Sequence, residues 1–262
     1  SRHLGLVTAA EVQGLREKLQ LLAVQAEKTI DLDGLLSLAA DSSPLSCNAI
    51  HLPRQSETVR IAVARDKAFC FYYEDSLDAL RDMGHELVPF SPLPYNALPP
   101  NIQGLYLGGG YPELYADKLS ENTAMRSSVK SALEQGLPCI AECGGFMYLT
   151  ESISNFPMVG FLPGKSFDTG KLTRFGYIRL KANRDTMLCK SGEEICGHEF
   201  HHWDCTQPGE CYTATKSTGK QWDCAVVTDP LYAGYPHFHF YSNLAFAENF
   251  YQACMKEGHR HD

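Results

Sequence analysis

The segment Ala141–Gly145 contains the strongest candidate for a reactive side chain. It reads Ala-Glu-Cys-Gly-Gly and lies where a buried strand expected at 138–142 meets a helix expected at 144–150. A cysteine on such a sharp turn points out of the sheet edge, and the start of a helix behind it favours the nucleophilic thiolate. Cys143 is therefore a candidate nucleophile. The local residues also fit a buried structural cysteine beside a glycine pair, so both interpretations stay open at this point.

A glycine-rich segment, Leu107–Glu113, could supply the groups that bind a developing negative charge. It reads Leu-Gly-Gly-Gly-Tyr-Pro-Glu and follows a short strand expected at 104–107. Bare backbone amides can approach a ligand closely and can hold an oxyanion opposite Cys143. The glycines do not have the spacing of a phosphate-binding loop or of a dinucleotide-binding loop. A flexible loop without a catalytic role is the alternative.

Two histidines near the carboxyl end are candidates for the base that a cysteine nucleophile needs. Residues 235–240 read Tyr-Pro-His-Phe-His-Phe, which suggests a strand end with His237 and His239 on one face. A nucleophilic cysteine requires an imidazole within hydrogen-bond reach. A single histidine is more often structural, but two at this spacing before a helix favour a catalytic role.

A second histidine cluster resembles a zinc-protease motif without fitting its geometry. His198-Glu199-Phe200-His201-His202 matches H-E-x-x-H, which binds zinc only when both histidines lie one helical turn apart. The neighbouring residues favour a strand, in which His198 and His202 stand about 13 Å apart. We therefore predict no metal site in this chain.

The elements that must position these residues alternate between strands and helices. Strands are expected at 59–64, 86–90, 104–107 and 138–142, and helices at 73–83, 121–135 and 144–150. This alternation predicts a parallel sheet with helices on both faces. From about residue 157 the chain is richer in β-structure, with strand candidates at 175–180, 194–203 and 225–228, and a final helix at 243–256.

The part of the chain before residue 59 has a different composition. Helical patterns at 9–29 and 31–40 precede a segment, 41–58, that is rich in Ser, Pro, Asn and Gln. We expect a helical piece at 1–40, a linker at 41–58 and the main domain at 59–262. The chain does not begin with Met, so we also expect that more protein once preceded Ser1.

Charge and cysteine content exclude several functional classes. The net charge is -8 and no long Lys/Arg run occurs, which argues against a nucleic-acid partner. No apolar stretch approaches the roughly 18 residues of a membrane span. The ten cysteines are scattered without a C-x-x-C pair, which is typical of reduced thiols in a cytoplasmic protein.

Taken together, these motifs resemble the cobyrinic acid a,c-diamide synthase family, which belongs to the class I glutamine amidotransferases and includes relatives acting on hydrogenobyrinic acid. The resemblance covers nearly the whole chain. It is carried by the segments 61–73, 106–114, 141–145, 197–201 and 237–243. It implies an α/β, flavodoxin-like glutaminase domain with a central, largely parallel sheet. Residues 1–40 resemble the end of the ATP-dependent synthetase domain that precedes the glutaminase in this family.

The resemblance also implies roles for individual residues. Cys143 would be the nucleophile and His237 the base, with His239 as second choice and without the acidic third member of other class I enzymes. The amides of Gly109, Gly110 and Gly144 would bind the oxyanion. Weaker candidates for contact with substrate or another domain are Arg65, Lys67, His198, Glu199 and His201.

The implied function is that of the glutaminase part of the synthase. Glutamine would be hydrolysed through a cysteine thioester, and the ammonia would serve ATP-dependent amidation of the a and c carboxylates of cobyrinic acid in cobalamin biosynthesis. ATP and Mg²⁺ would bind the synthetase domain, and this chain would bind no cofactor of its own. A homodimer is possible under this interpretation. Three alternatives remain: the same chemistry on hydrogenobyrinic acid or nickel-sirohydrochlorin, a different cysteine hydrolase, and a non-catalytic interaction module.

Overall fold

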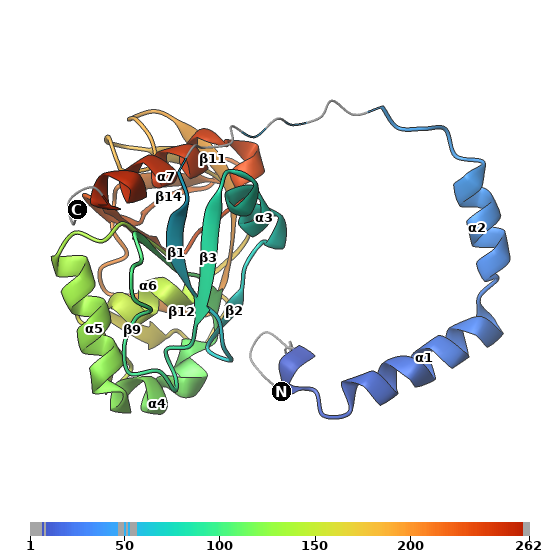
Figure 1. The fold of residues 1–262 in the computed structure, drawn as a ribbon, viewed down its shortest axis with the longest axis horizontal. Coiled ribbons are helices and arrows are strands. Elements are labelled where there is room, and N and C mark those ends of the chain that lie inside the picture. Colours follow the sequence, from blue (N-terminus) through green and yellow to red (C-terminus); the bar gives the residue numbers. More distant parts are fainter. Residues whose placement is uncertain (1–6, 8, 47–49, 51, 53–56, 259–262) are drawn as a thin grey trace. The chain divides into compact units, whose positions relative to one another are not determined.

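A computed structural model describes residues 7, 9–46, 50, 52 and 57–258 (Figure 1). The chain divides into two compact units, Ser1–His51 and Leu52–Asp262. The boundary between them falls inside the predicted linker, and each unit is described by itself.

The first unit is helical. It contains η1 (Ala9–Glu11), α1 (Leu15–Thr29) and α2 (Leu32–Ala40). The helix predicted from residue 9 begins at Leu15, because Gly14 has a left-handed backbone (φ 62°) that does not continue a right-handed helix. Asp31 caps α2 by accepting a 2.9 Å hydrogen bond from the amide of Gly34. No residue of α1 or α2 is buried, although both helices carry several leucines.

The second unit is built on a six-stranded sheet. Its strands, in spatial order, are β15 (Val226–Thr228), β16 (Leu231–Gly234), β6 (Cys139–Glu142), β4 (Gly104–Leu107), β1 (Val59–Ala64) and β3 (His85–Phe90). All neighbouring pairs are parallel except β15 with β16. This confirms the predicted α/β fold with a largely parallel central sheet.

Both faces of this sheet are buried, because successive side chains of each strand enter different cores. Along β1, Ala62 and Ala64 join one core, whereas Ile61 and Val63 join the other. The first core contains side chains from α4 (Ala116–Glu121), α5 (Thr123–Glu134) and α6 (Gly144–Leu149). The second contains side chains from α3 (Glu74–Asp82), α7 (Ala245–Gly258) and an antiparallel sheet. The described residues of this second unit also form two short 3-10 helices, η2 (Pro112–Tyr115) and η3 (Phe240–Ser242).

One predicted helix is present, and a short helix that the sequence did not predict lies directly before it. The helix expected over 121–135 consists of α5 alone, and α4 ends just before it at Glu121. Asn122 separates them by accepting a 3.2 Å hydrogen bond from the amide of Met125 and by donating to the carbonyl of Pro92. An asparagine at a helix start satisfies an amide that the helix itself leaves unpaired.

In the part of the chain that is described, no helix is long and apolar enough to cross a membrane.

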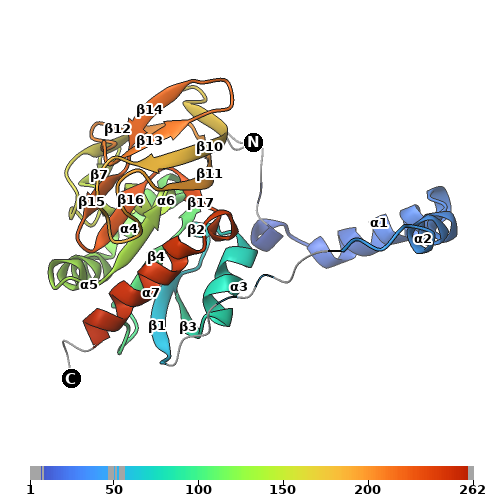
Figure 2. The ribbon, with the colours of Figure 1, turned by 90° about the horizontal axis from the view of Figure 1, so that it is seen from above.

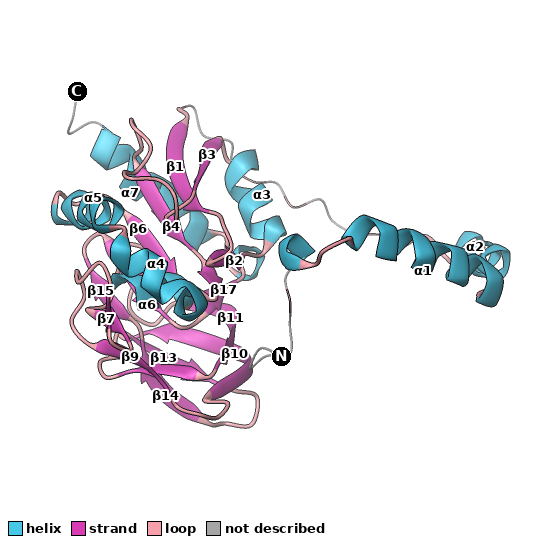
Figure 3. Ribbon diagram, turned by 90° about the horizontal axis from the view of Figure 1, so that it is seen from below, coloured by secondary structure: helices cyan, strands magenta, loops and turns pink. Residues whose placement is uncertain are grey.

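The β-rich second half forms further sheets beyond one end of the parallel strands, as Figures 2 and 3 both show. The antiparallel sheet has the order β14 (Gln221–Cys224), β13 (Tyr212–Thr215), β10 (Arg174–Ala182), β11 (Glu194–His201) and β17 (His237–Phe238). A smaller sheet joins β12 (Trp203–Cys205), β9 (Lys165–Asp168), β7 (Ser152–Ile153) and β8 (Phe156–Pro157). A short ribbon pairs β2 (Phe69–Phe71) with β5 (Gly109–Gly110).

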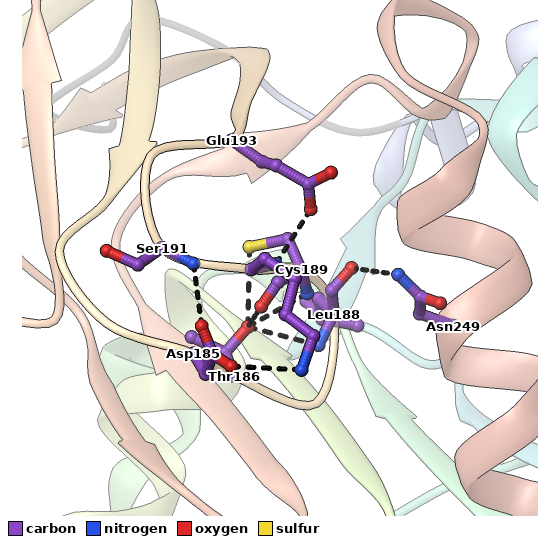
Figure 4. Close-up of polar contacts among 8 residues, drawn as sticks. Asp185, Thr186, Leu188, Cys189, Ser191, Glu193 and Asn249 are labelled. Carbon is purple, nitrogen blue, oxygen red and sulfur yellow. Dashed lines mark hydrogen bonds and ion pairs between the residues drawn. The ribbon is translucent and has the colours of Figure 1, made fainter.

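The loop between β10 and β11 is tied to α7 (Figure 4). Thr186 accepts hydrogen bonds of 3.1 Å from the amides of Leu188 and Cys189, which closes a tight turn. The side-chain amide of Asn249, on α7, donates a 2.8 Å bond to the carbonyl of Leu188. These bonds satisfy buried backbone groups and fix one end of the antiparallel sheet to the helix that covers the parallel sheet.

His85, at the start of β3, should make the fold less stable in acid. Its ring packs edge-on against Tyr251 at 5.1 Å, and neither ring nitrogen has a hydrogen-bond partner among the described residues. Burial lowers the pKa of His85 to about 4. The unfolded chain therefore binds more protons than the folded one between about pH 6.5 and pH 4, so stability present above pH 6.5 is lost as the pH falls through this window.

At pH 5 we expect His85 to cost the fold about 2 kcal/mol relative to pH 7.5. Urea unfolding of the wild type and of His85→Leu at the two pH values measures this loss. The variant should lose about 2 kcal/mol less than the wild type on acidification. Equal losses in the two proteins would show that His85 titrates normally in the folded state.

Candidate active site

Cys143 occupies a strained turn between β6 and α6. Its backbone has φ 48° and ψ -100°, a region that residues with a side chain rarely adopt. Its amide donates a 2.7 Å hydrogen bond to the carbonyl of Gly234, at the end of the neighbouring strand β16. The residue is 8% exposed. A tight, strained turn at the carboxyl end of a buried strand is the arrangement that presents a nucleophile in many α/β hydrolases.

The glycine-rich segment lies directly against this turn. The amide of Gly145 donates a 2.9 Å hydrogen bond to the carbonyl of Gly108. A Cβ atom on Gly145 would lie 2.1 Å from the carbonyl oxygen of Leu107, so no larger residue fits there. The amide nitrogen of Gly110 lies 3.2 Å from the point that a Cβ of Gly144 would occupy. The glycine-rich segment and the cysteine turn therefore form one backbone surface.

His237, on β17, brings its imidazole to the same place. The residue is 4% exposed, and its Cε1 atom lies 2.4 Å from the position of a Cβ on Gly109. The ring of Phe71 covers its edge at 4.7 Å between centroids. Burial disfavours the charged ring, but side-chain hydrogen bonds with Cys143 and Glu142 outweigh burial and raise the pKa of His237 to about 10. The His237 ring therefore lies against both Cys143 and Glu142, and these two hydrogen bonds favour its charged form.

His239, the second candidate base, has different surroundings. Its Nε2 atom lies 2.9 Å from the carboxylate of Asp75, and both side chains are substantially exposed, at 39% and 52%. Its ring contacts that of Tyr73 at 5.5 Å between centroids. Of the two histidines, His237 is the one whose hydrogen bond with Cys143 influences its pKa.

Glu142 is a member of the site that the sequence did not reveal. It is 1% exposed, and its Oε2 atom lies 3.4 Å from Nδ1 of His237. The resemblance implied a cysteine–histidine pair without an acidic member, because His239 stands two residues after His237. The carboxylate comes instead from the residue before the nucleophile. The signal in the sequence was a glutamate at the end of an otherwise apolar, buried strand, since a buried carboxylate requires partners.

His198 extends the site across the antiparallel sheet. In the strand register, His198 on β11 pairs with His237 on one side and with Tyr177 of β10 on the other. Burial lowers the pKa of His198, and the neighbouring His237 lowers it further. The three side chains therefore form a row that runs from the buried imidazole to Tyr177, which is 84% exposed.

Glu199 and His201 are buried, at 1% and 6% exposure, and point to the opposite face of β11 from His198. The ring of His201 stacks on Tyr235 at 4.0 Å, and its Nδ1 lies 2.6 Å from the carbonyl of Trp203. The zinc-protease pattern therefore lies on a strand, as predicted, with its members on two faces. The described residues contain no group of three or more His, Cys, Asp or Glu that could hold a metal ion.

The two basic candidates lie in the loop after β1. Arg65 forms a 3.1 Å ion pair with Glu74 on α3, and both side chains are about half exposed. Lys67 is exposed. Between them, Asp66 accepts hydrogen bonds of 2.7 and 3.0 Å from the amides of Ala68 and Phe69, which fixes the entry into β2. Asp66 therefore shapes this loop, whereas the side chains of Arg65 and Lys67 remain accessible to solvent.

Comparison with known proteins gives a family match over most of the chain. Residues 60–245 match the family of CobB/CobQ-like glutamine amidotransferase domains. The cobyrinate a,c-diamide synthase of Clostridium acetobutylicum is 40% identical over 254 residues, which cover 95% of this chain and 57% of that protein. The protein of the same name from Dehalococcoides mccartyi is 41% identical over 265 residues, covering 95% of this chain and 57% of that protein. The chain thus spans a little over half the length of these relatives.

Solved structures confirm the fold at low identity. PurLQS of Thermotoga maritima superposes with a TM-score of 0.53 at 16% identity, over 76% of this chain and 98% of that chain. A Thermoplasma acidophilum protein described as a GMP synthase subunit gives a TM-score of 0.51 at 17% identity, over 77% of this chain and 96% of that chain. With the family match over residues 60–245, these findings show that the chain belongs to the CobB/CobQ-like glutamine amidotransferases.

Proposed function

We propose that this chain hydrolyses the side-chain amide of glutamine through a thioester on Cys143. One observation carries the proposal: Cys143 lies on a strained turn and pairs with a buried imidazole, that of His237. A thiolate paired with an imidazolium is an activated nucleophile whose proton donor is already in place.

In the first half of the reaction, the Cys143 sulfur attacks the amide carbon of glutamine. The carbonyl electron pair moves to oxygen and forms a tetrahedral oxyanion. As this intermediate collapses, the C–N bond breaks, His237 donates its proton to the leaving nitrogen, and ammonia departs. The product is a glutamyl thioester on Cys143 beside a neutral imidazole.

In the second half, the neutral ring of His237 takes a proton from water, and the resulting hydroxide attacks the thioester carbon. The C–S bond breaks, glutamate leaves, and the thiolate and imidazolium are restored. The amides of Gly109, Gly110 and Gly144 are the proposed donors to both oxyanions. The Gly110 nitrogen lies 3.2 Å from the point that a Cβ on Gly144 would occupy, and this closeness supports the assignment, since several nearby amides bind a developing charge better than one.

The acceptor of the ammonia is proposed to be an ATP- and Mg²⁺-dependent synthetase domain that amidates the a and c carboxylates of cobyrinic acid. The names of the relatives support this substrate, and the chain spans 57% of the length of the Clostridium acetobutylicum relative. The ammonia would attack a carboxylate activated as an acyl phosphate, releasing inorganic phosphate. Hydrogenobyrinic acid and nickel-sirohydrochlorin carry carboxylates that the same chemistry could amidate.

Two surfaces of this chain support such a partner. The helices α1 and α2 expose large apolar side chains, including Leu22 at 64% and Leu36 at 68%. On β10, Tyr177 and Phe175 expose 84% and 53% of their surface, and the ring of Tyr177 lies 5.6 Å from that of His198. Exposed aromatic and aliphatic groups of this size are typical of interaction surfaces. We propose that the synthetase domain covers both.

Ammonia release from glutamine tests the proposal. It is measured for the chain alone and for the chain joined to the unmatched part of the Clostridium acetobutylicum relative, with ATP, Mg²⁺ and each of the three tetrapyrroles. We expect glutamine-dependent amidation in the joined protein and a glutamyl thioester on Cys143. Absence of both ammonia and thioester in the joined protein would exclude a glutaminase and favour a non-catalytic module.

Tyr177→Ser in the joined protein tests the proposed surface. We expect it to lower glutamine-dependent amidation more than it lowers glutamine hydrolysis by the isolated chain. Phe156→Ser, which changes an aromatic of 42% exposure on β8, is the matched control. Equal effects of the two substitutions would place the partner elsewhere.

A further inference from the structure

Glu142 forms the centre of a buried polar cluster that links three strands. Its Oε1 accepts a 2.9 Å hydrogen bond from the amide of Phe238 on β17, and its Oε2 accepts a 3.1 Å bond from the hydroxyl of Tyr106 on β4. The same Oε2 lies 3.4 Å from Nδ1 of His237. A carboxylate that is 1% exposed costs free energy unless such partners satisfy it.

We propose that Glu142 is the acidic positioning residue of this site, supplied by the strand of the nucleophile itself, and that it holds His237 with a proton on Nδ1 and with Nε2 turned to Cys143. The proposal rests on the proposed glutaminase function and adds a residue to its mechanism.

The hydrogen-bond pattern of the cluster supports this role. The two donors, the Phe238 amide and the Tyr106 hydroxyl, fix the orientation of the carboxylate, with Oε2 facing Nδ1 of His237. A carboxylate accepts and does not donate, so the Nδ1 that faces it carries the proton. The remaining nitrogen, Nε2, is then free to exchange a proton with the Cys143 sulfur, the leaving nitrogen and water.

The position of Glu142 in the chain also explains how its carboxylate and the Cys143 sulfur can both contact His237. It immediately precedes Cys143, so the strained turn sends the two side chains apart, one into the cluster and one to the surface formed by the glycine amides. His237 bridges them from β17. In this arrangement the positioning carboxylate ends the strand that leads into the nucleophile, and His239, where another class I enzyme has its acid, pairs with Asp75 instead.

Glu142→Gln tests the proposal with little change in shape. A glutamine can still accept from the Phe238 amide, but its NH₂ group faces His237 and favours the tautomer with the proton on Nε2. We expect kcat for glutamine hydrolysis to fall about 10²–10⁴-fold, by analogy with removal of the acid from a serine-protease triad, with a much smaller change in KM. Glu142→Asp, which keeps a carboxylate, should recover part of the loss.

Two measurements distinguish the proposed positioning role of Glu142 from a purely structural role. The rate at which iodoacetamide alkylates Cys143 should fall at pH 6–7 in Glu142→Gln and recover at higher pH. Without the carboxylate the charged ring of His237 is less stable, so it stabilises the reactive Cys143 thiolate less. In uniformly ¹⁵N-labelled wild type, the Nδ1 resonance of His237, assigned by its absence in His237→Asn, should be that of a protonated nitrogen. This second measurement applies even if the Gln variant does not fold.

Asp75→Asn provides the matched control. It removes the negative charge of the exposed pair with His239 and leaves the buried cluster intact. We expect kcat and the alkylation profile to stay at wild-type values. If Glu142→Gln matches wild type in kcat and alkylation, or if Nδ1 of His237 is unprotonated, the positioning role is wrong. If the wild type itself hydrolyses no glutamine, the failure lies with the proposed function.

Discussion

Replacing Cys143 with alanine is expected to reduce glutamine hydrolysis by on the order of 10⁵–10⁶-fold, the size of effect seen when a nucleophile is removed from a covalent mechanism. The loss should appear in kcat, because no thioester can form without the sulfur. Ammonia release, followed by a coupled assay, and mass spectrometry of the protein under turnover conditions measure the two effects. The mass of the acyl-enzyme should be present in wild type and absent in Cys143→Ala.

Cys139→Ala is the matched control for this prediction. Cys139 lies at the start of β6, the strand that leads into Cys143, and is fully buried in the first core, where burial raises the pKa of its thiol. Its sulfur is therefore held in the unreactive thiol form. The control should keep near wild-type activity with a modest loss of thermal stability. Hydrolysis that survives in Cys143→Ala, or that is lost equally in Cys139→Ala, would contradict a nucleophilic role for Cys143.

Replacing His237 with asparagine is expected to lower kcat about 10⁴-fold, because the ring donates a proton to ammonia and later removes one from water. His239→Asn should cost at most a few-fold, since that ring is 39% exposed and pairs with Asp75. Thermal unfolding of both variants shows whether either loss reflects the fold. A larger effect of His239→Asn on kcat would reverse the assignment of the base.

The pH dependence of the wild type adds to this second prediction. Hydrogen bonds with Cys143 and Glu142, acting against burial, raise the pKa of His237 to about 10. The ring therefore keeps the proton that the leaving ammonia needs through neutral and mildly alkaline pH. We expect kcat to stay level between pH 7 and pH 9 and to fall as the pH passes 10. A decline centred near pH 6.5–7 would indicate an unpaired imidazole.

The sequence by itself determined the elements and the strongest site candidates. The apolar run at 59–64 and the short apolar segments before Gly108 and Cys143 predicted buried parallel strands, because only strands covered on both faces lack polar alternation. The small residues around Cys143 predicted a sharp strand-to-helix turn, which the structure shows. These signals are local, so neighbouring residues suffice to detect them. The short helix α4 was missed because six residues are too few to show a helical repeat.

Only the tertiary structure decided how the site is assembled. Glu142 and His237 are 95 positions apart, and their contact depends on the strand β17 joining the antiparallel sheet beside β11. Residue spacing cannot reveal which of His237 and His239 reaches Cys143, since an alternating pattern puts both on one face. That choice follows from burial: one ring is enclosed by Phe71, Gly109 and a carboxylate, whereas the other meets solvent and Asp75. Long-range packing, which no local pattern encodes, therefore decides which of the two rings is enclosed and which carboxylate it meets.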